Sequence, residues 1–164
     1  MSFGWQPQIA NMRALEHKIP PPLVALVIAT AMWSISTLGP SLPLAPIVRQ
    51  VAVVALGVLG VGFDLLGVLT FLRSKTTVNP LHPDKTSALV TTSVYRLTRN
   101  PMYLGLLLLL AAWGIHLSAL WPFLGPVLFV LYINRFQIAP EERMLRRLFG
   151  DGYAAYAARV RRWL

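Results

Sequence analysis

Four long apolar runs, separated by polar or proline-rich stretches, dominate the pattern of hydrophobic positions along the chain. Each run is long enough, and poor enough in charge, to form a membrane-spanning helix. The second run has about 26 residues, which at about 1.5 Å per residue exceeds a hydrocarbon core of about 30 Å, so this helix should tilt or project into the cytoplasm. We predict helices at residues 23–38, 47–72, 102–117 and 122–138.

Prolines mark the starts of these helices and the connections between them. The run Pro20–Pro22 ends any preceding helix and suits the first turn of the next one, because proline lacks an N–H group. Residues 39–46 contain three prolines and no charge, which predicts a tight connection. Pro101 fits the first position of the third helix, with Asn100 as its cap.

Three polar segments lie outside the predicted helices. Residues 1–22 form an N-terminal tail that has two interpretations, a short interfacial helix or a loose tail. Residues 73–101 contain two X-Pro pairs, which disfavour helix, so we predict a mostly extended loop. Residues 139–164 predict a C-terminal helical segment. Together, residues 23–164 are expected to form a single domain.

The composition supports a membrane protein over a soluble globule. Apolar residues make up 55% of the 164 residues and charged residues only 13%, with a mean hydropathy of +0.58. A soluble fold could not cover its surface with so few polar groups. The expected class is therefore an all-α integral membrane protein with four transmembrane helices, a cytosolic loop and a C-terminal helical segment. Disulfides, thiolate metal sites and cysteine nucleophiles are excluded because the chain has no Cys, and no metal site is predicted.

The chain has fifteen Lys and Arg residues and six Asp and Glu residues, and the positions of the basic residues indicate membrane topology rather than nucleic-acid binding. They stand between and after the apolar runs and are not interleaved with aromatic residues on one polar domain, so no nucleic-acid partner is expected. In the predicted four-helix topology all but Arg49 fall on one side. The positive-inside rule then places both termini and both polar segments, 73–101 and 139–164, in the cytoplasm.

Polar and small residues inside the second run indicate where its helix meets a partner. Asp64 is the single acidic residue in this span, and a carboxylate there is costly unless it faces a partner or a polar cavity. A structural hydrogen bond, for instance to Asn134 or Arg135, and a catalytic role both remain open. Four glycines in the same helix would allow close approach of another helix or of a ligand: Gly57, Gly60, Gly62 and Gly67.

Two polar motifs flank the last pair of apolar runs. The first, LVTTSVYRLTRNPMYLG at residues 89–105, resembles the LVTSGVYxxxRHPxYxG stretch of isoprenylcysteine carboxyl methyltransferases. The second, EERMLRRLFGDGYAAYAARV at residues 141–160, resembles their EExxLxxxFGxxYxxYxxxV ending. The NPMYxG and Glu-Glu elements are also similar to those of phosphatidylethanolamine N-methyltransferases. The resemblance covers residues 47–164, and FLRSKTTVNP looks like a bacterial branch of the family.

The resemblance implies a multi-pass methyltransferase of the bacterial inner membrane that uses S-adenosyl-L-methionine. Its cofactor would lie in a cytosolic pocket. A lipophilic or lipid-like acceptor would enter from the bilayer, and membrane lipids would surround the protein. A carboxylate of the Glu pair would bind the ribose hydroxyls or the amino group of the cofactor. The implied cofactor-binding residues are Ser87, Ala88, Leu89, Val90, Tyr95, Arg99, Asn100, Pro101, Met102, Tyr103, Glu141 and Glu142.

The chain departs from the family pattern at two positions. Asn100 replaces the histidine before the proline and cannot titrate near neutrality. Gln137 replaces an arginine that helps to hold the acceptor, so Arg135, the nearest cation, is the candidate catalytic residue in its place. Prenylcysteine carboxylate is thus one choice of acceptor among several. If an amine acceptor needs a base, the candidates are Asp64 and Glu142.

Structural alternatives exist for the motif residues as well. Tyr95 and Tyr103 would also suit a membrane interface, and Glu141 and Glu142 would favour the start of a helix through its dipole. Two other functions compete with a methyltransferase. A membrane-embedded sterol-type reductase would use NADPH, but the chain has no dinucleotide fingerprint. A non-catalytic membrane adaptor would not need the polar loop between the second and third helices.

Overall fold

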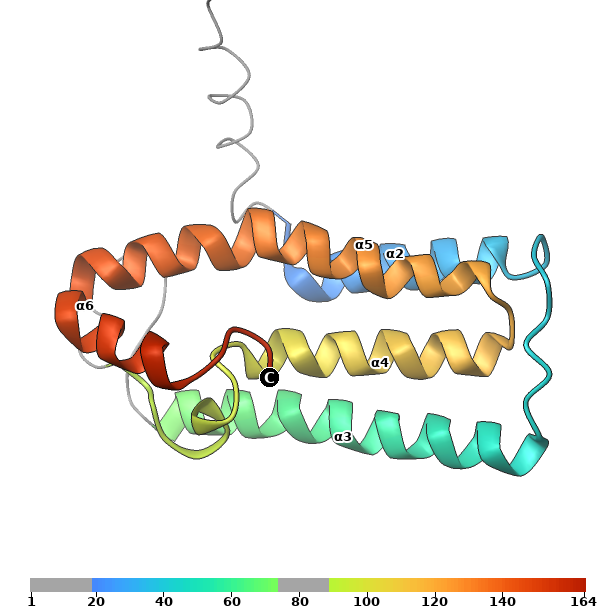
Figure 1. Cartoon of the computed structure of the whole chain (residues 1–164), viewed down its shortest axis with the longest axis horizontal. Helices are drawn as coiled ribbons and strands as arrows, with labels where there is room; N and C mark the ends of the chain where they lie inside the picture. The colour runs from blue at the N-terminus through green and yellow to red at the C-terminus, as the bar shows by residue number, and fades with distance from the viewer. Residues whose placement is uncertain (1–18, 74–88) are drawn as a thin grey trace, which may run out of the picture.

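The computed structural model describes residues 19–73 and 89–164, and within these ranges the chain is helical without any named strand. Its principal helices are α2 (Pro21–Ile35), α3 (Pro46–Arg73), α4 (Pro101–Leu117), α5 (Leu124–Ile133) and α6 (Ala139–Arg159). Figure 1 shows α4 in the middle of the bundle, with α3 along one side and the pair α2 and α5 along the other. The prediction of an all-α protein is confirmed for the described residues.

The helix starts follow the prolines of the sequence. Helices α2, α3 and α4 each begin at a proline, Pro21, Pro46 and Pro101 respectively. Proline suits the first turn because the N–H group that it lacks would have no partner there. The connection between α2 and α3 packs on the one after α4, since the backbone N–H of Leu42 donates to the carbonyl of Ser118 at 2.8 Å.

Two helical stretches are long and apolar enough to cross a membrane, Pro46–Arg73 and the continuous run Trp121–Arg159. Helices α2 and α4 are apolar too but shorter, with 15 and 17 residues. Only 11% of the most apolar window of α3 is buried, so its side chains largely face away from the protein. A core helix of a soluble protein would be mostly buried. The described helices thus support a membrane protein with two candidate spans, and the four predicted spans stay a prediction.

Tight packing in the bundle depends on glycine. A Cβ atom on Gly60 would lie 2.9 Å from the carbonyl oxygen of Gly105, so α3 and α4 approach closely at this point. On the other side of α4, Gly125 of α5 allows the side chain of Met32 to fill the core, where Phe129 is also fully buried. The helix-packing interpretation therefore holds for Gly60, whereas Gly57 and Gly62 face open space.

The predicted fourth helix, residues 122–138, continues without a break into the C-terminal helical segment. The chain passes from α5 through a π-helical turn, Asn134–Ile138, directly into α6. A π turn holds an extra residue, so it rotates the side chains that follow it relative to those before it. One of its residues, Gln137, is buried and donates a hydrogen bond of 2.9 Å to the carbonyl of Ile19.

Helix α6 is sharply bent at Gly150. The backbone there has φ 46° and ψ −120°, which only glycine adopts without strain. Past this point the chain folds back toward α4, as the red end of the ribbon in Figure 1 shows. The bend brings Tyr153 and Tyr156, both buried, and the C-terminal segment, residues 160–164, to the start of α4.

Candidate active site

The loop before α4 is held in place by the part of α6 that follows the bend. Its residues Ser93–Arg96 form a short 3₁₀-helix, which buries Val94 and Tyr95. The hydroxyl of Tyr156 donates a 2.7 Å hydrogen bond to the backbone carbonyl of Tyr95. The two motifs recognised in the sequence are therefore in direct contact.

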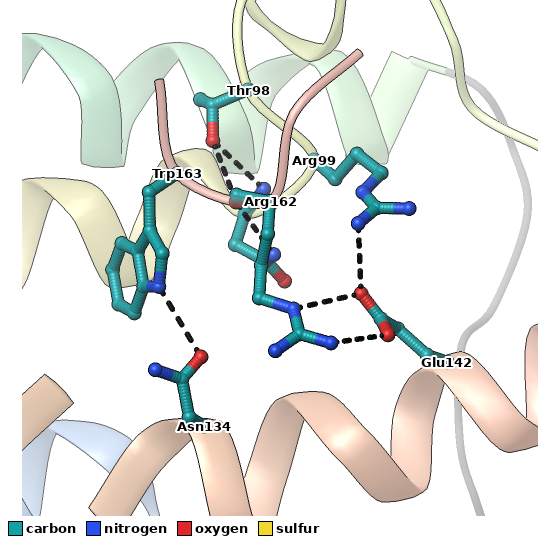
Figure 2. A network of polar contacts seen from close by, with 7 residues as sticks. Thr98, Arg99, Asn134, Glu142, Arg162 and Trp163 are labelled. Carbon is teal, nitrogen blue, oxygen red and sulfur yellow. Dashed lines mark hydrogen bonds and ion pairs between the residues drawn. The ribbon is translucent and has the colours of Figure 1, made fainter. Parts of the chain in front are cut away.

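The C-terminal segment packs against the same loop through its backbone (Figure 2). The carbonyl of Arg162 accepts hydrogen bonds from Thr98 Oγ1 at 3.1 Å and Asn100 Nδ2 at 2.9 Å. The N–H of Arg99 donates to the carbonyl of Arg161 at 3.0 Å. Asn100 thus occupies the cap position of α4, but its side chain makes no capping hydrogen bond and binds the C-terminal segment instead.

A buried carboxylate links this segment to α6. Glu142 is 8% exposed, and its two oxygens accept hydrogen bonds from Arg162 Nε at 3.0 Å and Arg162 Nη2 at 2.7 Å. Arg99 Nη2 lies 3.1 Å from the same carboxylate. We call these three residues, Arg99, Glu142 and Arg162, the Glu142 triad (Figure 2). Its arrangement matches the general rule that buried charges are paired.

The neighbouring Glu141 has a different partner. Its Oε1 accepts a 2.5 Å hydrogen bond from the hydroxyl of Tyr103, near the start of α4. Such a short bond is typical of a hydroxyl donating to a carboxylate. The two glutamates of the motif, which the sequence does not distinguish, therefore face different groups.

A cavity of about 240 Å³ opens between these elements. It approaches the lower end of the range for small-molecule sites, about 300–1,000 Å³. Every predicted cofactor-binding residue within the described ranges lines it, while Ser87 and Ala88 lie outside those ranges. The lining residues are Phe71, Leu89, Val90, Tyr95, Arg99, Asn100, Pro101, Met102, Tyr103, Glu141, Glu142, Leu145, Tyr153 and Tyr156.

Two of the three predicted catalytic residues do not line this cavity. The carboxylate of Asp64 packs against the backbone of Gly105, two residues past Tyr103 on α4. Arg135 lies in the π turn, with its guanidinium 5.5 Å from the ring centre of Phe136. Asn134, which was considered as a partner of Asp64, accepts a hydrogen bond from Trp163 Nε1 at 3.2 Å. Catalytic roles for Asp64 and Arg135 stay predictions.

The cavity presents groups of opposite charge on an otherwise aromatic and apolar lining. The Nε atom of Arg99 is buried and has no hydrogen-bond partner among the described residues. A buried donor of this kind is costly unless a ligand satisfies it. Burial and the nearby Glu141 raise the pKa of Tyr95 to about 12, so its hydroxyl stays neutral at physiological pH. The site can therefore bind a ligand that carries both an anionic and a cationic group.

Sequence reasoning named neither Arg162 nor Trp163 as part of the site. The charge of Arg162 was used only in the topology argument, and both residues are brought in by the bend at Gly150. Tyr153 and Tyr156 stood in the recognised motif but were not predicted to line the cavity. Their spacing of three residues, which places both on one face of a helix, was the available signal.

Comparisons with known proteins find related sequences. The family model of phospholipid methyltransferases matches residues 48–152. A Haemophilus influenzae protein described as uncharacterized is 52% identical over 63 residues, which are 38% of this chain and all of that protein. Probable protein-S-isoprenylcysteine O-methyltransferases of Oryza sativa, subspecies indica and japonica, are each 40% identical over 98 residues.

Those 98 residues are 58% of this chain and 50% of each rice protein, so the match spans about half the length of these relatives. No solved structure matches significantly. The matched region begins at the third residue of α3 and ends within α6, and it contains all of α4 and α5 and both glutamates of α6. Because the family model covers well over half of the sequence, the chain belongs to the phospholipid methyltransferase family.

Proposed function

We propose that this protein is a membrane-embedded methyltransferase that uses S-adenosylmethionine to methylate a lipophilic acceptor. The observation that carries the proposal is the cavity between the two motifs. It is lined by Glu141 of α6 and Tyr103 of α4, which are hydrogen-bonded to each other. Membership of a methyltransferase family supports the reaction type. The similarity to rice proteins described as probable protein-S-isoprenylcysteine O-methyltransferases supports an acceptor of isoprenyl-lipid character.

The residues of the cavity fit the proposed cofactor. S-adenosylmethionine carries a carboxylate, an ammonium group, ribose hydroxyls and an adenine ring. The unpartnered Nε of Arg99 would bind the carboxylate, and Glu141 would accept hydrogen bonds from the ammonium or the ribose hydroxyls. The tyrosines Tyr95, Tyr153 and Tyr156 give an aromatic lining for the adenine.

When bound, S-adenosylmethionine supplies a methyl group that its sulfonium already activates for displacement. The protein then has mainly to align the acceptor and exclude water, which is catalysis by positioning. The rigid start of α4 and the hydrogen-bonded loop before it would hold the reactants in place. Glu142 is poorly suited to take a proton, because both its oxygens already accept hydrogen bonds from a guanidinium. An acceptor that is already anionic would need no base.

The position of the cavity supports entry of the acceptor from the bilayer. Its lining includes Phe71 at the end of α3 and Met102 at the start of α4. Both helices continue from there as apolar stretches, and the neighbouring Leu69 and Leu72 of α3 are exposed. A lipid-like molecule could thus reach the cavity without crossing water, while the polar cofactor would enter from the aqueous side.

The distribution of basic residues supports an orientation of the protein in the membrane. We place the cavity and the basic α6 on the cytoplasmic side of the bacterial inner membrane, with both termini cytoplasmic and four spans. The support is the charge distribution, since Arg49 is the one Lys or Arg of the sequence that lies outside the N-terminal tail, residues 73–100 and residues 135–164. Arg49 donates a 3.1 Å hydrogen bond to Ser118.

Calorimetry on the purified full-length chain in lipid nanodiscs tests the proposal. We expect S-adenosylhomocysteine, the product of methyl transfer, to bind, and NADPH not to bind. Binding of NADPH alone would instead identify a reductase. Binding of neither ligand would contradict the proposal and favour the adaptor.

A further inference from the structure

Arg162 does not line the cavity, yet it makes the shortest ion pair with Glu142, which does. Its Nη2 lies 2.7 Å from Glu142 Oε2, compared with 3.1 Å between Arg99 Nη2 and Oε1. The side chain of Arg162 is 38% exposed, whereas those of Arg99 and Glu142 are 14% and 11% exposed. Arg162 therefore approaches the site from its outer side.

The C-terminal segment gives Arg162 little freedom to move away. Its carbonyl accepts two hydrogen bonds, from Thr98 and Asn100, and the next residue, Trp163, is bound to Asn134. Thr98 is fully buried. The hydrogen bonds that Arg162 donates to the Glu142 carboxylate also raise the pKa of Arg162, so its guanidinium remains charged at any physiological pH.

The Glu142 triad does not neutralise itself. It contains two guanidinium groups and one carboxylate, so its formal charge is one positive unit. Arg162 occupies both oxygens of Glu142 through Nε and Nη2, which is the strongest geometry for this kind of pair. Arg99 keeps a single contact with Oε1, and its own Nε is buried without a partner. The surplus charge is therefore carried by the arginine that lines the cavity.

We propose that Arg162 is a positioning residue that makes Arg99 available to a ligand carboxylate, by occupying the carboxylate that would otherwise neutralise it. This inference rests on the proposed function, because it takes the ligand to be an S-adenosyl amino acid. Without Arg162, Glu142 would draw the Arg99 guanidinium into a one-to-one pair. Arg99 would then have no surplus positive charge to offer a ligand, while the cavity would keep its shape.

A purely structural role for Arg162 makes different predictions. If Arg162 only fastens the C-terminal segment, its loss should weaken the binding of every ligand of the cavity to the same extent. If it sets the charge at Arg99, only ligands with a carboxylate should be affected. S-adenosylhomocysteine and 5′-methylthioadenosine form a suitable pair of probes, because both contain the thioether nucleoside but only the first has an amino acid carboxylate.

Calorimetry with both probes on the full chain in nanodiscs is the test. In Arg162→Gln we expect the Kd of S-adenosylhomocysteine to rise about tenfold or more, the usual effect of losing one charge-assisted hydrogen bond. The Kd of 5′-methylthioadenosine should stay within about twofold, well below that effect. Arg161→Gln is the matched control, because it removes the same charge from an exposed neighbour whose bond to Arg99 is made by the backbone.

The double variant Glu142→Gln/Arg162→Gln separates charge from structure. It removes the competing carboxylate together with its partner, so Arg99 regains its surplus charge and the affinity for S-adenosylhomocysteine should recover toward that of the wild type. Arg162→Lys keeps the charge without the paired geometry and should lie between the wild type and Arg162→Gln. This variant covers the case in which the double variant fails to fold.

Two results would overturn the inference. One is an equal loss of affinity for both probes in Arg162→Gln. The other is a folded double variant that binds S-adenosylhomocysteine no more tightly than Arg162→Gln does. Both are distinct from failure of the proposed function, in which the wild type itself would bind neither probe.

Discussion

The hydroxyl of Tyr103 donates a 2.5 Å hydrogen bond to Oε1 of Glu141, and this bond joins α4 to α6 across the cavity. In the sequence these residues are 38 positions apart, one in the first turn of α4 and the other in the first turn of α6. Their contact fixes the carboxylate that we assign to the ribose or the ammonium group of the cofactor. The bond therefore has a direct experimental consequence.

Replacing Tyr103 with Phe should weaken binding of S-adenosylhomocysteine. The loss should be about 1.5–3 kcal/mol, as for other hydrogen bonds to charged groups, because Glu141 would no longer be oriented. Titration calorimetry gives this value. Tyr132→Phe is the matched control, since the Tyr132 hydroxyl is buried and has no hydrogen-bond partner among the described residues. Equal binding by Tyr103→Phe and the wild type would remove Glu141 from the cofactor site.

Single substitutions should distinguish the two adjacent glutamates. Glu141→Gln should lower ligand affinity and leave the unfolding midpoint in detergent nearly unchanged. Glu142→Gln should instead lower the midpoint, because it leaves the guanidinium groups of Arg99 and Arg162 close together without their carboxylate. We expect a loss of stability of about 2–3 kcal/mol, below the roughly 3–5 kcal/mol for a fully buried pair, because Arg162 is 38% exposed. The reverse pattern would contradict the assignment of the two residues.

The bend in α6 depends on Gly150. Substitution by Ala should cost about 1–3 kcal/mol, since an L-residue is strained at its φ of 46° and ψ of −120°. Relief of this strain would straighten the helix and withdraw Tyr156 from Tyr95, so ligand binding should be lost with stability. Gly152→Ala is the control, because a Cβ there meets no atom within 4 Å and its backbone is not in the left-handed region. If both variants behave alike, the bend is not needed for the site.

Two glycines of α3 should respond differently to enlargement. Gly60→Leu should destabilise the bundle by about 1–3 kcal/mol or more, because its Cβ would already lie 2.9 Å from the carbonyl oxygen of Gly105. Gly62→Leu adds a side chain where no atom lies within 4 Å of the new Cβ, so thermal unfolding should change little. Comparable destabilisation by the two substitutions would show that α3 is not packed on α4 in this register.

The proposed topology can be tested by cysteine labelling, with no background because the natural chain has no Cys. Thr37, in the connection between α2 and α3, and Asp151, next to the bend of α6, are both exposed. Figure 1 shows this connection and this bend at opposite ends of the bundle. We expect an impermeant thiol reagent to label Thr37→Cys from the periplasmic side and Asp151→Cys only after the inner membrane is opened. Labelling of Asp151→Cys in intact spheroplasts would refute the orientation.

The sequence by itself determined where the helices lie and which motif residues line the cavity, whereas the binding of a cofactor by these residues stays a prediction. Apolar runs and prolines locate α2, α3 and α4 to within a few residues, because lipid-compatible length and the missing N–H of proline are local properties. The motifs likewise indicated the residues of the cavity, since those from Leu89 onward all line it. These features can be recognised without knowing how the helices pack.

Only the tertiary structure decided how the charged residues are paired. Arg162 and Glu142 are 20 residues apart, and they meet because Gly150 reverses the chain between them. Adjacent Glu141 and Glu142 have separate partners because successive helical positions point about 100° apart, a consequence of 3.6 residues per turn. No periodicity in the chain encodes such contacts, since they depend on one bend and one π turn whose effects appear only when distant segments pack together.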